Sequence, residues 1–192
     1  MGDALQVAEF EHREILRACG FAEDDVPGAL AIATALLGER SVLAVPAAEV
    51  WGEGESTCDE LILVREDLAP RHRDFVILHE VGEIWVARRR LRFVDFLEKE
   101  RVCDAIAGAL LAPTSAFAPA LKDHRDDFAA LAHEFDATET SMALRFGEVT
   151  STPIRVVRPG LTRERGRAYD WSRGAARRAL TDQPDRFVEI AA

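Results

Sequence analysis

The sequence is poor in cysteine and has no long hydrophobic run. Its 192 residues include three cysteines, Cys19, Cys58 and Cys103, and no Cys-x-x-Cys pair. An odd and sparse set argues against a disulfide framework and favours a reducing compartment. No apolar stretch reaches the roughly 20 residues that span a bilayer, and the first residues lack the basic segment and apolar core of a signal peptide. We therefore expect a cytoplasmic protein without a membrane segment.

Basic residues are scarce outside the C-terminal part of the chain. The net charge is −10, and residues 155–192 hold nine arginines against five acidic residues, a surplus of +4 that leaves −14 for residues 1–154. Such an acidic body is a poor surface for nucleic acid, so direct nucleic-acid binding is not expected. We interpret residues 1–158 as one domain and residues 159–192 as an Arg-rich extension docked on it. Plain solvation of the extension, or contact with an acidic partner, are the alternatives.

Hydrophobic spacing predicts both helices and short strands in a chain of globular composition, 48% hydrophobic and 30% charged. Apolar positions at helical spacing indicate helices at 4–19 (closed by Gly20), 28–38, 71–90, 98–112, 125–135, 138–147 and 172–180. Short β-prone runs indicate strands at 41–45, 61–64 and 152–157. The Gly- and Glu-rich residues 52–57 are typical of a loop. The pattern predicts an α+β fold in which a small sheet packs on a cluster of helices.

One predicted helix, residues 75–86, is apolar around almost its whole circumference and is expected to be buried. It nevertheless carries His79, Glu80 and Glu83 within one turn, on an arc of roughly 100°. Two buried carboxylates three residues apart repel each other and lose their hydration. Because a bound cation removes both penalties, we infer a metal site.

The run from His79 to Glu83 is one residue away from the zinc-protease signature H-E-x-x-H. Residues at i and i+4 share a helix face, which makes His79 and Glu83 candidate metal ligands. Glu80 is the candidate catalytic base, because the residue after the first ligand lies beside the metal and can take a proton from water. Gly82 leaves the helix surface open to close approach by another element.

A third ligand is expected from the next helix. Glu100 and Asp104 are also four residues apart and share a face. We assign Glu100 as a ligand and expect Asp104 to hydrogen-bond His79 and fix its tautomer. The alternative is a structural polar cluster, because H-E-x-x-E is frequent by chance and a histidine on an apolar helix is usually a core residue.

Three segments together resemble the ImmA/IrrE-type metallopeptidase family. Residues 73–82 resemble its active-site helix, residues 100–113 its second block ending in Leu-Leu-x-Pro, and residues 128–147 its helix-turn-helix-like third block. The resemblance covers about residues 58–158. It implies a zincin-like fold, with strand 61–64 as the edge strand beside the active-site cleft, and a zinc ion. It also implies proteolysis of a regulatory protein, typically a repressor of mobile elements or stress responses.

By position, the resemblance assigns His79 and Glu100 as ligands and Glu80 as the catalytic base. Glu83 stands in place of the family's second ligand histidine, and Asp104 in place of its usual asparagine. One imidazole and two carboxylates form a harder, more anionic site, which would bind zinc more loosely or shift metal preference toward manganese, and would make a bound water less acidic. We expect zinc, the ion that the resemblance implies, with manganese as the alternative.

Further residues have weaker functional interpretations. Cys58 is a candidate inhibitory thiol at the open position of the metal, and the alternative is a small, half-buried residue. His124 and His133 could stabilise a transition state, although a surface histidine is the simpler interpretation of each. Residues 123–148 hold seven acidic residues against two arginines, so we interpret the helix-turn-helix-like segment as a core helix pair.

Taken together, these residues predict a metal-dependent endopeptidase, and the family resemblance implies that it cleaves a regulatory protein such as a helix-turn-helix repressor. One alternative is a catalytically decayed zincin-like module that binds a regulatory partner without cleaving it. Another is a toxin–antitoxin or phage-type regulator that acts through contacts alone.

Overall fold

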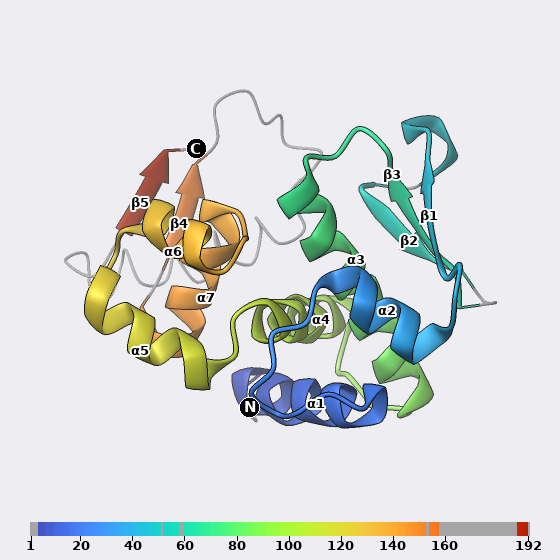
Figure 1. Ribbon diagram of the computed structural model, residues 1–192, viewed down its shortest axis with the longest axis horizontal. Coiled ribbons are helices and arrows are strands. Elements are labelled where there is room, and N and C mark those ends of the chain that lie inside the picture. The colour runs from blue at the N-terminus through green and yellow to red at the C-terminus, as the bar shows by residue number, and fades with distance from the viewer. Residues whose placement is uncertain (1–3, 51, 58–59, 153, 158–187, 192) are drawn as a thin grey trace.

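Seven α-helices and two small sheets form the part of the chain that the structure, a computed structural model, describes: residues 4–50, 52–57, 60–152, 154–157 and 188–191 (Figure 1). The helices are α1 (Ala4–Cys19), α2 (Ala29–Leu37), α3 (Pro70–Arg88), α4 (Phe96–Leu111), α5 (Thr114–His124), α6 (Phe128–Glu134) and α7 (Glu139–Thr150). The strands are β1 (Val42–Val45), β2 (Gly54–Ser56), β3 (Ile62–Arg65), β4 (Ile154–Val157) and β5 (Val188–Ala191), and a 3-10 turn, η1, covers Ala47–Glu49.

The predicted α+β class is confirmed, and each helix and strand predicted within the described residues has a counterpart with ends shifted by a few residues. The end of the first helix shows why such boundaries can be read from a sequence. Gly20 has φ of +80°, and the backbone N–H of Phe21 donates to the carbonyl of Leu16. This Schellman-type ending needs a residue without a Cβ at its left-handed position. The helix predicted at 172–180 lies outside the described residues.

Three elements differ from the prediction. Residues 52–57, expected as a loop, contain strand β2, which forms because its backbone pairs with β3 rather than through any local alternation. Helix α5 was not predicted, because it follows Pro113 and contains Pro119, and proline normally ends a helix. Strand β5 was not predicted either, and it pairs in parallel with β4. Strands β2 and β5 form through pairing with distant segments, which a reading of local sequence patterns does not detect.

The three-stranded sheet has the order β1-β3-β2, with β1 parallel and β2 antiparallel to β3. Strand 61–64 was expected at the edge of the sheet, and this was wrong: β3 lies in the middle because residues 54–56 pair on its other side. The edge next to α3 is β2. An ideal Cβ built on Gly54 would overlap Val76 Cγ1 and lie 3.3 Å from Glu80 Oε1. The backbone of β2 therefore lies directly on the buried helix.

Helices α3 and α4 lie between the three-stranded sheet and the α5–α7 cluster (Figure 1). As predicted, α3 is buried on most of its circumference, including Val76, Leu78, Val81 and Ile84. Gly82 faces α4, and an added Cβ there would lie 3.4 Å from the backbone oxygen of Cys103. The close approach expected at Gly82 is thus present: an added methyl group would just reach α4 at ordinary contact distance.

A buried arginine ties the helices together behind this contact. Arg145 of α7 is 1% exposed and donates to the carbonyl oxygen of Ala112 at 2.9 Å and to Thr114 Oγ1 at 3.0 Å. It also pairs with Glu9 of α1 and, at 3.2 Å, with Glu148. A buried guanidinium needs partners for all its donors. Arg145 is therefore a core residue that joins α1, α7 and the α4–α5 junction.

Along the described residues, no single helix is long and apolar enough to cross a membrane. Helices α4 and α5 taken together have the length and apolar composition of a membrane span, but they are bent by 71° where they join.

We expect Gly54→Ala to destabilise the protein by about 1–3 kcal/mol, because the added methyl group meets the stiff, β-branched side chain of Val76. Urea unfolding followed by circular dichroism measures the free energy of unfolding. Gly28→Ala is the control, because a Cβ at Gly28 meets nothing within 4 Å and should cost less than about 1 kcal/mol. Equal losses in the two variants would show that β2 is not held against α3.

Candidate metal centre

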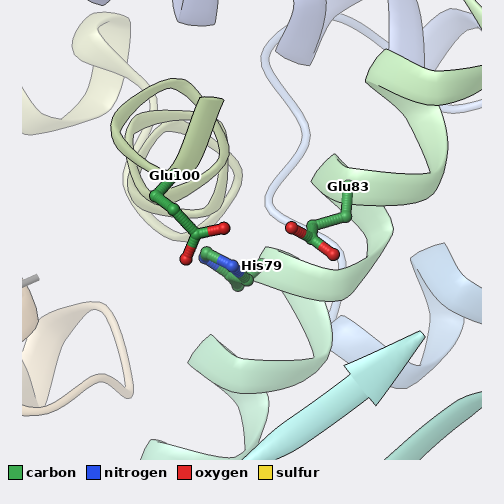
Figure 2. Close-up of side chains that lie close together, drawn as sticks. All are labelled: His79, Glu83 and Glu100. Atoms are coloured by element: carbon green, nitrogen blue, oxygen red, sulfur yellow. The ribbon is translucent and has the colours of Figure 1, made fainter. Parts of the chain in front are cut away.

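Helices α3 and α4 bring together the three side chains that the sequence singled out as ligands. Potential ligand atoms of His79, Glu83 and Glu100 all lie within 4.8 Å of one another. In Figure 2 the imidazole comes from α3 and lies between the carboxylates of Glu83 and Glu100. His79 and Glu83 are one helical turn apart, and Glu100 comes from the facing helix. The arrangement therefore depends on the close packing of α3 and α4 at Gly82.

The start of α4 fixes which of its residues face the cluster. Asp95 caps the helix, and its Oδ1 accepts the backbone N–H of Glu98 at 2.8 Å. The first helical turn is thereby held in place. Glu100 and Asp104 follow on one face, four residues apart.

Asp104 holds the imidazole of His79. The distance between Asp104 Oδ1 and His79 Nδ1 is 2.7 Å, the contact that was expected from the sequence. Although burial lowers the pKa of His79, its hydrogen bond to Asp104 and the nearby carboxylates raise this pKa to about 9. With Nδ1 engaged, Nε2 is the nitrogen left for a ligand.

Glu83 has a cationic partner that sequence reasoning missed. Lys99 Nζ lies 2.7 Å from Glu83 Oε1, and Ser56 Oγ of β2 donates to Oε2 at 3.4 Å. Burial raises the pKa of Glu83, but the ammonium of Lys99 lowers it below its ordinary value. The sequence offered one indication of this contact: Lys99 is one of only two lysines in the chain, and it directly precedes the candidate ligand Glu100.

Glu100 is the most protonatable of the candidate ligands that carry a carboxyl group. Burial raises its pKa, and the neighbouring carboxylate of Glu83, to which it hydrogen-bonds, raises it further against the lowering effect of His79. Without an ion, the stronger tendency of Glu100 to hold a proton and the ammonium of Lys99 thus both reduce the negative charge of this carboxylate pair. A divalent cation would displace the proton, because a carboxylate ligand is bound in its ionised form.

Glu80 is buried beside the cluster with an unsatisfied oxygen. It is 6% exposed, and its Oε2 has no hydrogen-bond partner among the described residues. Burial raises its pKa to about 7, against the lowering effect of His79 and of a hydrogen bond with Ser56. Such an unpartnered, buried acceptor is unfavourable unless it has a proton or a cation nearby. It is therefore placed to exchange a proton close to neutral pH.

The donor set fits a divalent cation. One imidazole and two carboxylates are within common reach, as in zinc sites with three protein ligands and an open position. The raised pKa values of His79 and Glu80 and the unsatisfied oxygen of Glu80 mark a site whose charges are not balanced by its side chains alone.

The ligand cluster contains none of the other cysteines and histidines that the structure describes. Cys58 is outside the described residues. Cys103 is buried, and burial raises the pKa of its thiol far above the ordinary range, so it packs as a small apolar residue. His124 lies 2.8 Å from Glu134 in an exposed pair, and His133 is exposed. Neither histidine belongs to the ligand cluster.

Comparison with known proteins identifies one family. Residues 43–146, more than half of the chain, match the model of the IrrE N-terminal-like domain, a peptidase family. The matched segment runs from β1 into α7 and includes the whole cluster. None of the curated proteins compared with the chain matches it.

We expect Glu80→Gln to stabilise the metal-free protein at pH 8.5 by about 1–3 kcal/mol and to have a smaller effect at pH 5. A carboxyl whose pKa rises from 4.5 to about 7 on folding contributes stability below pH 4.5, and this contribution is lost as the pH rises through 7. Glutamine does not ionise, so the variant does not lose stability at high pH for this reason. Urea unfolding in the presence of a chelator at both pH values measures the difference, with the exposed Glu39→Gln as control. Parallel pH profiles of the variant and the unsubstituted protein would contradict the burial of a titrating Glu80.

Proposed function

The chain belongs to the peptidase family of the IrrE N-terminal-like domain, and from this premise we propose that it is a metal-dependent endopeptidase. The family resemblance inferred from the sequence is confirmed, and the matched segment, residues 43–146, begins and ends earlier than the inferred range of about 58–158. The small sheet and helix cluster are those of a zincin-like domain. The observation that supports the proposed activity is the ligand cluster of His79, Glu83 and Glu100 beside the buried Glu80, whose Oε2 has no hydrogen-bond partner among the described residues.

His79, Glu83 and Glu100 would hold the ion, and Asp104 keeps the imidazole oriented. When bound, a divalent ion supplies Lewis acidity, which polarises a peptide carbonyl and acidifies a water molecule. Glu80 accepts a proton from the attacking water as the oxygen adds to the carbonyl carbon. It then returns this proton to the leaving amine as the C–N bond breaks. In the metal-free protein burial already raises the pKa of Glu80 to about 7, the range in which a group can both accept and release a proton.

We assign zinc as the ion and manganese as the alternative. A site with two carboxylates is harder than one with two imidazoles, which favours manganese. The ammonium of Lys99 on Glu83 offsets part of that added negative charge. The sparse cysteines fit a reducing, cytoplasmic setting.

The substrate class follows from the resemblance of the three sequence blocks. We propose a regulatory protein, such as a helix-turn-helix repressor, as the substrate. One observation supports a second candidate function, a module that binds such a regulator without cleaving it. The Lys99–Glu83 pair already neutralises one carboxylate, so the cluster is partly satisfied without an ion.

The purified protein should hold about one zinc or manganese ion per chain, and His79→Ala should lose it, because the substitution removes the single imidazole of the cluster. Inductively coupled plasma mass spectrometry measures the stoichiometry. His133→Ala is the matched control, since this histidine is exposed and lies outside the cluster. Metal that stays bound in His79→Ala would place the ion elsewhere.

Glu80→Gln should retain the ion and lower peptide cleavage at least about 100-fold, because the proton acceptor is lost. New peptide termini in a proteome-derived peptide library, counted by mass spectrometry, measure cleavage. Undiminished cleavage by Glu80→Gln would refute its role as the base. A metal-loaded, unsubstituted protein that cleaves neither the library nor repressors from its own genome would favour the binding module.

A further inference from the structure

Lys99 contacts the residue at which the chain departs from the H-E-x-x-H pattern. Its ammonium lies 2.7 Å from Glu83 Oε1, and the two side chains are 30% and 20% exposed. An ion pair this shielded from water interacts more strongly than a surface pair. The contact also crosses from α4 to α3, so it links Glu83 to the helix that carries Glu100.

The formal charges explain what this contact does. In a site of two histidines and one glutamate, the ligands carry one negative charge. Here the ligands are one histidine and two glutamates, which carry two. Adding the ammonium of Lys99 returns the total to one negative charge. Glu83 together with Lys99 is as neutral as the imidazole that the pair replaces.

The geometry leaves Glu83 able to bind an ion while it is paired. The ammonium engages Oε1, and Oε2 accepts the longer contact of 3.4 Å from Ser56. Each carboxylate oxygen has two lone pairs. A metal bond to Glu83 therefore does not require the Lys99 contact to break.

We propose that Lys99 is a positioning residue that orients Glu83 and balances its charge, so that the Glu83–Lys99 pair takes the place of the second histidine of the metal site. The inference rests on the proposed function, because it takes the cluster to be a metal site. It explains how the three ligands, taken together with Lys99, can keep the charge of a ligand set with two histidines and one glutamate; Asp104, which holds His79, lies outside this count. It also identifies Lys99 and Glu83 as a unit that must be substituted together.

The test measures the affinity of the metal-free protein for Mn²⁺ and Zn²⁺ by competition with a chromophoric chelator at pH 7.5. Lys99→Met should tighten Mn²⁺ binding at least about tenfold, because the site then carries an uncompensated second negative charge. Lys99→Arg keeps the charge and should bind like the unsubstituted protein. Lys122→Met, at the other lysine of the chain, is exposed and changes the net charge equally, so it should have no effect.

The same substitution in a Glu83→His background gives the sharper comparison. There Lys99 has lost the carboxylate that holds it, and its partly exposed side chain can turn to solvent. Lys99→Met should then alter Mn²⁺ affinity less than about threefold. The metal-free Lys99→Met protein should also unfold at lower temperature than Lys122→Met, because the half-buried carboxylate of Glu83 loses its cationic partner.

The outcomes separate this inference from the proposed function. If the unsubstituted protein binds the metal, and Lys99→Met and Lys122→Met bind it with equal affinity, the proposed role of Lys99 is overturned and the metal site stands. A loss of stability in Lys99→Met without a change in affinity would reduce the pair to a structural contact. Binding in the Glu83→His proteins alone would show that Glu83 is not a ligand. No binding in any folded variant would refute the metal site itself and the charge balance with it.

Discussion

The close packing of α3 against α4 at Gly82 is the constraint on which the rest of the structure depends. Every candidate ligand lies on one of these two helices, so their separation decides whether three donors can reach one ion. A side chain at position 82 would reach the backbone of α4 at ordinary contact distance, and any larger group would widen the gap. Arg145 holds the far end of α4 through the carbonyl of Ala112. Arg145 thereby ties the C-terminal end of α4 to α7 and, through Glu9, to α1.

The second constraint is the burial of acidic side chains between these helices. Each carboxyl group of the cluster has a different means of reducing its charge. Glu83 has the ammonium of Lys99, Glu100 has a raised pKa and a hydrogen bond with Glu83, and Glu80 has a raised pKa and one oxygen without a hydrogen-bond partner among the described residues. This graded arrangement distinguishes groups suited to hold an ion from a group suited to move a proton.

Sequence reasoning located the helices and the site because both depend on short-range periodicity. His79, Glu83, Glu100 and Asp104 lie at helical spacing, so their shared faces could be predicted before the structure was known. What it missed depends on contacts between distant segments. The hydroxyl of Ser56 enters the site through the pairing of β2 with β3, and Lys99 reaches Glu83 across the helix interface. Neither contact leaves a periodic trace in the sequence.

The overlap between a side chain at position 54 and Val76 has a consequence for how this domain can vary. The two positions share one volume, so the sum of their sizes is constrained more tightly than either residue. A relative that carries alanine in the strand can keep the same backbone if the helix position shrinks from valine to alanine. Positions 54 and 76 should therefore change as a correlated pair across the family. A glycine facing a valine can be replaced by two small residues, but not by two large ones.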